Sequence, residues 1–543
     1  MMKPWSLLLV VFFALLGGCR ELTLEEQAEL NIPPQNRVPP KYLRTEAGKP
    51  SSVELSTTDP VILNALFELL EKSDKIGAKV SKLEGSAFEE LLSVGSPNAY
   101  LLRNRYLNPG VMLALALAED PDPALRSRLV EYARWERSMD VRSTALTALA
   151  RMQNLEDERS LHEAMSHLNP IVRFGGMEAL GNWGKPEKAI PLLKLAAEND
   201  RQRVLRVYAA GMMARLGNSE GRDKLRGFLN DTDWVVHAMA ARYLGDYGEA
   251  GDYDVFLRRL DAQNTNDFVL AEYAVASLKL FKKKSAPKPE PQSDSDFGLG
   301  FILAPITVTA PRVDAPFGIS SKINNVLLRL LESRSEVRPD DLGVINDASR
   351  VFANLTTLTG HMMRLRYTEL GFLLTEGLAG VKDFSLQSEL QTVARTAKNP
   401  QMRAAALVSL GYTKEEQFVS LFRETINDQN LTVRLGAFEA LVVSQSQQAL
   451  FIVGDKAQND QSLSVRVMAA AAYWKMGNPS GRNMLLEFAE NEDWYVRAHA
   501  VSYLGELGDG QDYRYLLDRL SRDTDDIVRS ELVLALMRLR EKK

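Results

Sequence analysis

Apolar residues in the stretch 233–260 recur at the spacing of two amphipathic helices. In the first helix they fall three or four residues apart, at Val236, Met239, Ala240, Tyr243, Leu244 and Tyr247. Asp233 can cap the start of this helix, and Gly248 can end it. After a short turn the same spacing returns at Tyr253, Phe256, Leu257 and Leu260. The pattern therefore predicts a helix–turn–helix unit that buries one face of each helix.

This unit occurs twice in the chain. Residues 233–260 read DWVVHAMAARYLGDYGEAGDYDVFLRRL, and residues 493–520 read DWYVRAHAVSYLGELGDGQDYRYLLDRL. Further matches lie 260 or 261 residues apart, which predicts that residues 60–282 are duplicated as residues 321–543. We call these copies the first array and the second array. Other residues that recur in both are Asn64/Asn325, Arg103/Arg364, Arg105/Arg366, Tyr106/Tyr367, Trp234/Trp494 and Tyr253/Tyr513.

Each array is itself periodic. An arginine returns every 31 to 33 residues, at Arg142, Arg173 and Arg206 in the first array and at Arg403, Arg434, Arg466, Arg497 and Arg529 in the second. A period near 32 residues is typical of solenoids, whose units bury their apolar faces only against their neighbours.

The segment 493–509, DWYVRAHAVSYLGELGD, carries a resemblance to a known family. It resembles the DxxVRxxAxxxLGxxG pattern of HEAT-like repeats of the phycocyanobilin lyase type. The resemblance implies an all-α fold, with two tandem HEAT-like α-solenoids joined by a flexible linker. It says little about function, because this fold carries scaffolds, adaptors and a few enzymes.

The N-terminal sequence MMKPWSLLLVVFFALLGGCREL has the layout of a secretory signal. Lys3 precedes an apolar run over residues 7–16, which is too short to span a bilayer comfortably. The run ends in Leu-Gly-Gly-Cys at residues 16–19, which resembles the lipobox of bacterial lipoproteins. The resemblance implies that residues 1–18 are a signal peptide and that Cys19 is acylated, with palmitate among the attached chains.

Cys19 is the chain's only cysteine, so no intramolecular disulfide and no cysteine-based metal site can form. Arg20 follows it where an aspartate could stand. In enteric lipoproteins, a residue other than aspartate directly after the acylated cysteine implies delivery to the outer membrane. We therefore expect a lipid-anchored protein of the bacterial cell envelope, on the outer membrane and facing the periplasm.

Two polar segments flank the first array. Residues 19–59 are proline-rich and predict an extended tether. Residues 283–320 predict a linker that contains an apolar stretch, FGLGFILAPITVT, at 297–309. Three interpretations of this stretch stay open: packing along a solenoid, docking of a partner, or a membrane-dipping loop, which its two glycines and one proline disfavour. Its candidate partner-binding residues are Phe297, Phe301, Ile302 and Leu303.

The recurring arginines and tryptophans each allow two interpretations. The arginines can form a structural ladder with aspartates of neighbouring turns, such as Asp233 and Asp493, or they can line a groove for an anionic ligand. We favour the structural ladder, because a paired arginine also covers apolar surface with its stem. Trp234 and Trp494 can be core residues or exposed anchors for a partner, and large aromatic side chains favour the core.

The sequence offers little catalytic chemistry. The net charge of -5 over 543 residues gives no footprint for nucleic acid. One His-Glu pair, His162-Glu163, is too few for the di-iron sites of some helical-repeat hydroxylases, so we expect no metal and no cofactor. We find no glycine-rich phosphate loop, no GxSxG elbow and no catalytic cysteine.

We therefore expect a non-enzymatic scaffold or adaptor that presents concave helical surfaces to other envelope proteins. Two alternatives remain. One is a structural subunit of an envelope, secretion or motility complex, and the other is an envelope enzyme with its site in the groove between the arrays. The sequence does not fix the oligomeric state.

Overall fold

The computed structural model describes residues 59–73, 109–118, 123–136, 138–151, 158–261, 266–285, 317–333, 370–379 and 383–540, with the single residues 76, 87, 106, 363, 366 and 367. Every regular element in these ranges is a helix, and none of them contains a strand. The predicted all-α solenoid is confirmed.

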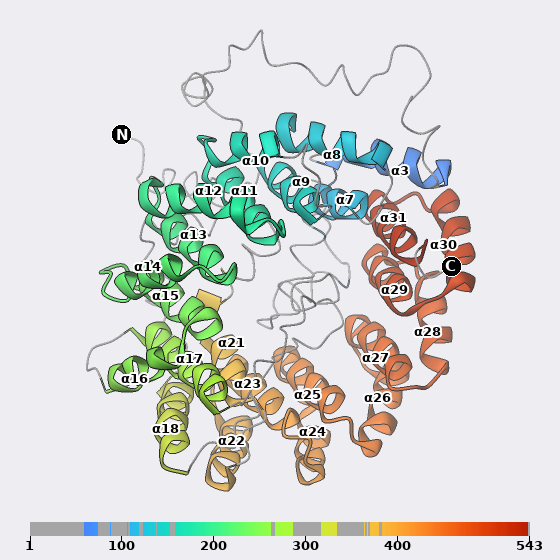
Figure 1. Cartoon of the computed structure of the whole chain (residues 1–543). Helices are drawn as coiled ribbons and strands as arrows, with labels where there is room; N and C mark the ends of the chain where they lie inside the picture. Colours follow the sequence, from blue (N-terminus) through green and yellow to red (C-terminus); the bar gives the residue numbers. More distant parts are fainter. Residues whose placement is uncertain are drawn as a thin grey trace, which may run out of the picture.

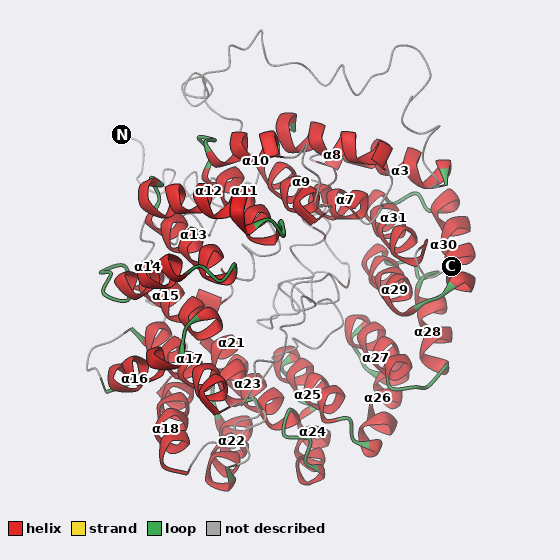
Figure 2. Ribbon diagram, in the orientation of Figure 1, coloured by secondary structure: helices red, strands yellow, loops and turns green. Residues whose placement is uncertain are grey.

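The helices form two layers around a ring (Figures 1 and 2). The inner layer consists of α7 (Pro109–Ala118), α9 (Met139–Arg151), α11 (Pro170–Asn182), α13 (Arg203–Arg215), α15 (Trp234–Tyr247), α17 (Asp267–Ser285), α21 (Leu370–Leu378), α23 (Pro400–Gly411), α25 (Leu431–Ser444), α27 (Leu463–Lys475), α29 (Trp494–Leu507) and α31 (Asp526–Arg540). The outer layer consists of α3 (Pro60–Glu71), α8 (Pro123–Trp135), α10 (Glu158–Met165), α12 (Pro186–Asn199), α14 (Ser219–Phe228), α16 (Ala250–Arg259), α18 (Phe317–Ser333), α22 (Phe384–Thr396), the short 3₁₀ helix η8 (Glu416–Phe418), α24 (Val419–Thr425), α26 (Gln447–Asn459), α28 (Ser480–Phe488) and α30 (Gly510–Arg522).

Short polar side chains start the inner helices. Asp233 and Asp493 accept hydrogen bonds from the backbone N–H two residues further on, at 2.9 and 2.8 Å. The same geometry occurs at Asn169, Asn399 and Asn430. These contacts satisfy N–H groups that the first helical turn leaves unpaired. Asp233 and Asp493 therefore act as helix caps.

Glycine in the LG part of the repeat lets consecutive inner helices approach closely. A Cβ on Gly245 would lie 2.8 Å from Ala276 of α17, and one on Gly505 would lie 2.4 Å from Ala535 of α31. Such contacts are too short for carbon atoms, so a larger residue would push the helices apart. The motif thus sets the spacing of the inner layer.

The first and second arrays meet at both of their ends. At what we call the central junction, α17 packs against α18 and α21. At the closing junction, α31 packs against α3 and α7, so the C-terminal helices lie beside the N-terminal ones and the ring is complete (Figure 1). From the sequence, only a linker between the arrays was predicted, and neither of these direct contacts was expected.

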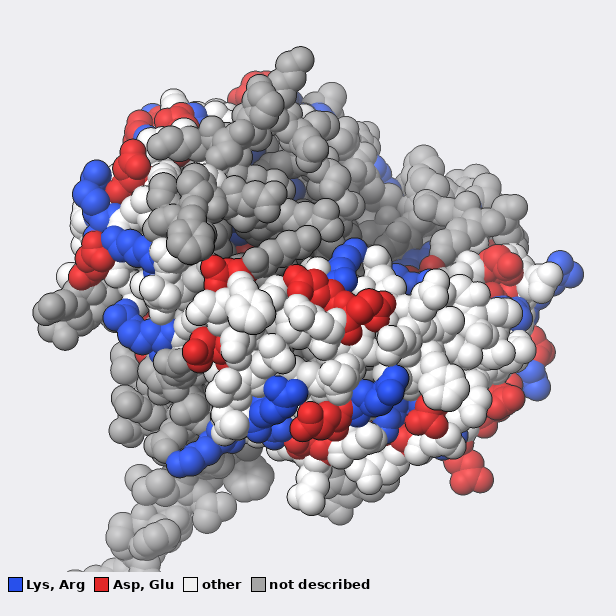
Figure 3. Space-filling model, turned by 90° about the horizontal axis from the view of Figure 1, so that it is seen from below, with Lys and Arg blue, Asp and Glu red and all other residues white. Residues whose placement is uncertain are grey.

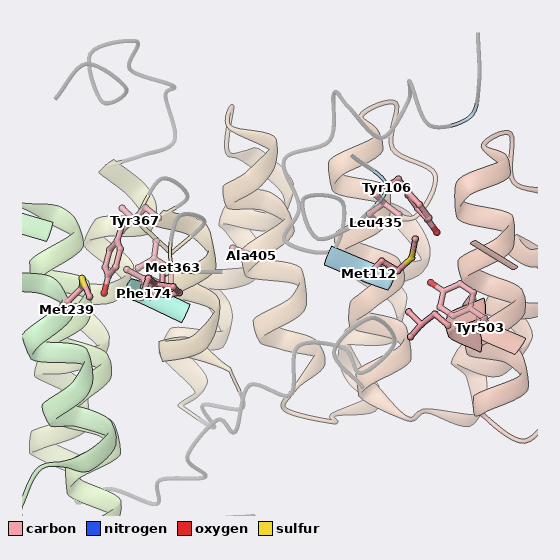
Figure 4. Close-up of a cluster of buried hydrophobic side chains, with 14 of the residues drawn as sticks. Tyr106, Met112, Phe174, Met239, Met363, Tyr367, Ala405, Leu435 and Tyr503 are labelled. Atoms are coloured by element: carbon pink, nitrogen blue, oxygen red, sulfur yellow. The ribbon is translucent and has the colours of Figure 1, made fainter. Parts of the chain in front are cut away.

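The helix boundaries around the linker differ slightly from those predicted. Helix α17 continues to Ser285, and α18 already begins at Phe317, whereas the prediction placed the linker at 283–320. A single hydrophobic core runs through the described residues from Ile62 to Leu539. Figure 4 shows residues of this core from distant parts of the chain, among them Phe174 and Tyr503.

Candidate functional site on the inner layer and its junctions

Most of the recurring arginines brace one hairpin against the next. Three of them bind the carboxylate of an aspartate 25 to 27 residues further on, in the pairs Arg173–Asp200, Arg403–Asp428 and Arg497–Asp523. Arg173 is 7% exposed and holds both oxygens of Asp200, at 2.7 and 3.0 Å. Arg206 and Arg434 donate instead to the backbone carbonyls of Asp200 and Asp428. These contacts support the structural interpretation of the arginines.

Two further arginines contact other groups. Arg142 donates to the carbonyl of Ala133 at 3.3 Å and lies 3.4 Å from His167. The guanidinium of Arg466 lies over the ring of Phe488, 5.5 Å from its centroid. The groups that these two arginines contact therefore also belong to the solenoid.

Arg529, at the end of the series, connects the two ends of the chain. Its guanidinium binds Glu68 of α3 at 3.0 Å. Hydrogen bonds from Arg529 and Lys72 lower the pKa of Glu68 to about 2. The arginine series thus ends in an ion pair across the closing junction.

Both recurring tryptophans pack between the arrays. Trp494 is 8% exposed and meets Tyr106 of the first array edge to face, with centroids 5.9 Å apart. Trp234 meets Tyr367 of the second array in the same way at 6.3 Å and stacks on Phe268 at 5.3 Å. Of the two interpretations, these contacts support core packing.

Six charged side chains meet at the central junction. They are Arg242 and Asp246 of α15, Glu272 and Lys279 of α17, and Arg366 and Glu376 of the second array. Arg366 donates to both oxygens of Glu272, at 2.5 and 2.8 Å, and also to Glu376. Lys279 lies 2.7 Å from Asp246 and 2.6 Å from Glu376. Three acids thus face three bases across the two arrays.

The electrostatics of this group favour fixed charges. Burial alone would raise the pKa of Glu376, but Arg366 and Lys279 lower it well below the usual range. Burial would lower the pKa of Lys279, but Asp246 and Glu376 raise it. Both groups stay ionised near neutral pH, so the arrangement suits a permanent connection between arrays better than proton transfer. The acids that converge between the arrays are therefore matched by cations.

Three histidines act as hydrogen-bonding groups within the layers. Burial and a nearby arginine lower the pKa of His167 and of His237 to about 4. His237 contacts the hydroxyl of Tyr273. His499 is 0% exposed, and its Nε2 lies 2.9 Å from the hydroxyl of Tyr503. At neutral pH His167 and His237 are therefore uncharged.

The two residues of the His-Glu pair contact different partners. His162 lies 4.0 Å from Glu158, whereas Glu163 pairs with Arg134 and Arg159. Within the described ranges, no three His, Cys, Asp or Glu side chains come close enough together to hold a metal ion.

Glu439, on α25, has an unusual proton affinity. Burial raises its pKa to about 7. A carboxyl group of this kind can exchange a proton near neutral pH. General acid–base catalysis also needs a substrate atom within hydrogen-bond reach, so this residue by itself does not define an active site.

Several predicted features lie outside the described residues. These are Cys19 with its leader and tether, and the stretch 297–309 with Phe297, Phe301, Ile302 and Leu303. Among the helices that are described, none is both long and apolar enough to cross a bilayer.

The charged group at the central junction was not predicted from the sequence. The recurrence of Arg105 as Arg366 at equivalent positions of the two arrays was the available signal in the sequence. Two exposed phenylalanines of the outer layer were not predicted either: Phe384 and Phe451 are 82% and 81% exposed. Neither recurs in the other array, so the duplication gave no signal for them.

Comparison with known proteins identifies the repeats. The HEAT-repeat family matches residues 127–207, 192–279 and 452–537. Curated proteins give no match. The crystal structure of Kap121p is 14% identical, and the match covers 90% of this chain and 53% of that chain with a TM-score of 0.33.

Two complexes of the same karyopherin give similar values. Kap121p bound to the extreme C-terminus of the protein phosphatase Cdc14p is 14% identical, and the match covers 89% of this chain and 54% of that chain with a TM-score of 0.32. Kap121p bound to Ste12p is 13% identical, with 89% and 52% covered and a TM-score of 0.32. The chain spans about half the length of these karyopherin chains.

The family match includes inner and outer helices of both arrays, and the hairpins of the structure show how each repeat packs on the next. The described part of the chain is an α-solenoid, and its residues 127–279 and 452–537 are similar to HEAT repeats.

Proposed function

We propose that this chain is a non-catalytic, protein-binding scaffold that a lipid on Cys19 holds at the bacterial cell envelope. The closed ring supports this proposal, because ion pairs and aromatic contacts at both junctions hold the arrays in fixed positions. A surface that is fixed before binding loses less conformational entropy when a partner docks. Stacked repeats also offer extended faces, which suit protein partners better than small ligands.

The leader sequence supports the envelope location. Acylation at Cys19 would attach the ring to one membrane through the tether at 19–59. We propose the periplasmic side of the outer membrane. A structural subunit of an envelope complex is the alternative, and it differs in requiring stoichiometric assembly.

The anchor can be tested by metabolic labelling. The full-length chain with a C-terminal tag should incorporate a clickable palmitate and fractionate with the outer membrane. The Cys19→Ser variant should lose both the label and this fractionation, because it lacks the acceptor thiol. Unchanged labelling or unchanged location in the variant would remove the anchor from the proposal.

The scaffold function can be tested by site-specific photo-crosslinking. A photo-reactive residue at Leu195 on α12 or at Asp518 on α30 places the probe on exposed positions of the outer layer. The proposal expects crosslinks to a discrete envelope protein whose purified form binds the purified ring. A partner that co-purifies in fixed stoichiometry would favour the structural subunit. The scaffold would be refuted if neither position gave a crosslink and no envelope protein bound the purified ring.

A further inference from the structure

The helices α22, α24 and α26 of the second array carry fewer charges than the outer helices at the equivalent positions of the first array. Each of these three helices carries only two charged residues. The helices at the equivalent positions of the first array, α8, α10 and α12, carry four, three and four. We call the outer face of α22, α24 and α26 the neutral face.

Side chains that both donate and accept hydrogen bonds take the place of the missing charges. The three helices of the neutral face contain six, two and four Ser, Thr, Asn or Gln residues, whereas α8, α10 and α12 contain one each. The exposed ones are Ser385, Ser388, Thr392, Thr396, Ser420, Gln447, Gln448, Gln458 and Asn459. Figure 3 looks at the ring from this side, where much of the described surface is neither acidic nor basic.

Two exposed phenylalanines lie on this face. Phe384, the first residue of α22, is 82% exposed, and Phe451, in the second turn of α26, is 81% exposed. A phenyl ring that stands in water costs free energy, which burial against a partner would recover. Aromatic enrichment with depletion of charge is the composition of the central part of protein interfaces.

We propose that the neutral face is an interface between two copies of this chain. In a two-fold contact, residues near the axis meet their own copies, so a charged face would bring like charges together. Hydroxyl and amide side chains avoid this problem, because each carries a donor and an acceptor and can bond to its own kind. The charges that remain sum to zero over the three helices, and Arg395 is matched within the face by Glu424 at 3.5 Å.

The size of the face fits a weak dimer. Helices α22 and α26, of 13 residues each, are about 20 Å long, and α24, of 7 residues, is about 10 Å long. With a width of about 10 Å for each helix, the face covers about 500 Å² per copy. The two copies would bury about 1,000 Å² together, at the lower limit of specific interfaces. We therefore expect a dimer with a dissociation constant on the order of micromolar rather than an obligate one. This inference is independent of which other protein the scaffold binds.

Sedimentation velocity of the full-length protein over a range of concentrations tests the proposal. The wild type should pass from monomer to dimer, and Phe384→Ser/Phe451→Ser should weaken dimerisation at least about 30-fold, because four phenyl rings leave the interface. Both side chains are exposed, so circular dichroism should show an unchanged fold. The matched control is Leu195→Ser, which removes a 61% exposed apolar residue from α12 of the first array and should have no effect.

A thiol crosslink gives a second, independent readout. In a Cys19→Ser background, Ser420→Cys on α24 should give a crosslinked dimer with a short bismaleimide. Arg159→Cys, at the equivalent position of the first array, should not. The proposal is overturned if the wild type stays monomeric at every concentration, if the phenylalanine variant dimerises normally, or if both cysteine variants crosslink equally.

Discussion

Arg366→Met should destabilise the ring far more than the loss of a surface charge. The substitution keeps a long side chain but leaves Glu272 and Glu376 without a shared cation. Glu272 is 0% exposed, so water cannot replace the two hydrogen bonds that Arg366 donates to it. Breaking a buried ion pair in this way costs about 3–5 kcal/mol. That is a large part of the roughly 5–15 kcal/mol by which a folded protein is stable.

The penalty should depend on pH. In the wild type the pKa of Glu376 lies below its ordinary value of 4.5, so its contribution to stability is complete above that pH and is lost on further acidification. In Arg366→Met only Lys279 opposes the effect of burial, and the pKa of Glu376 rises. The deficit of the variant should therefore be largest at neutral and higher pH and should shrink as the pH falls toward about 5.

Urea unfolding at pH 8 and pH 5, followed by circular dichroism, measures both effects. The double variant Arg366→Met/Glu272→Met should recover most of the loss, because no buried carboxylate then lacks its partner at that position. Arg522→Met is the control: it breaks an ion pair to Asp518 whose side chains are 57% and 59% exposed, and it should change stability by less than about 1 kcal/mol. A deficit below about 1 kcal/mol for Arg366→Met, or additive effects in the double variant, would refute the reasoning.

Three further predictions concern the closing junction, Glu439 and the second array on its own. A double-mutant cycle with Glu68→Gln and Arg529→Met should give a coupling of about 1 kcal/mol that falls with added salt, because both partners are partly exposed; zero coupling would contradict the ion pair. Glu439→Gln should stabilise the protein at pH 8, by up to about 3 kcal/mol, and should have little effect below pH 4.5. The reason is that the pKa of Glu439 is raised in the folded state, so the stability of the wild type falls as the pH rises from 4.5 to about 7. An equal effect at pH 4 and pH 8 would contradict this prediction. Residues 317–543 alone should form a dimer in sedimentation that Phe384→Ser does not disrupt, and a folded monomer would be the opposing result.

Local structure could be predicted well from the sequence. Apolar spacing located both helices of the repeat, and Asp233 caps α15 as expected. The aspartates that pair with the arginines were not identified correctly, because the capping residue was taken as the partner. The partner lies instead in the turn before the cap, as Asp523 does two residues before Asp525. Periodicity alone cannot decide which of two nearby aspartates caps the helix and which one pairs with the arginine.

Closure of the ring could not be predicted. It depends on the sum of small rotations between consecutive repeats, and no single repeat reveals that sum. Trp494 illustrates the limit, because its own array gives no reason to expect Tyr106, almost 400 residues earlier, against its ring. The exposed Phe451 was equally hidden, since an apolar residue within an amphipathic helix is normally assigned to the core.

The predicted duplication offers a physical reason for the closed ring. Helix α17 binds α21 at the central junction, and α31 binds α7, their equivalents, at the closing junction. On α31, Glu531 and Arg538 stand where α17 carries Glu272 and Lys279, so the charges that face the second array recur at the end of the chain. Units that bind head to tail build a filament unless the rotation from one unit to the next closes a ring. Two arrays that meet at both ends form such a ring, so the rotation from one array to the other is half a turn. A linear solenoid needs polar capping repeats, whereas here each apolar end covers the other. A single array carries one end that is equivalent to α7 or α21 and one that is equivalent to α17 or α31. It should therefore complete the ring with a second copy of itself.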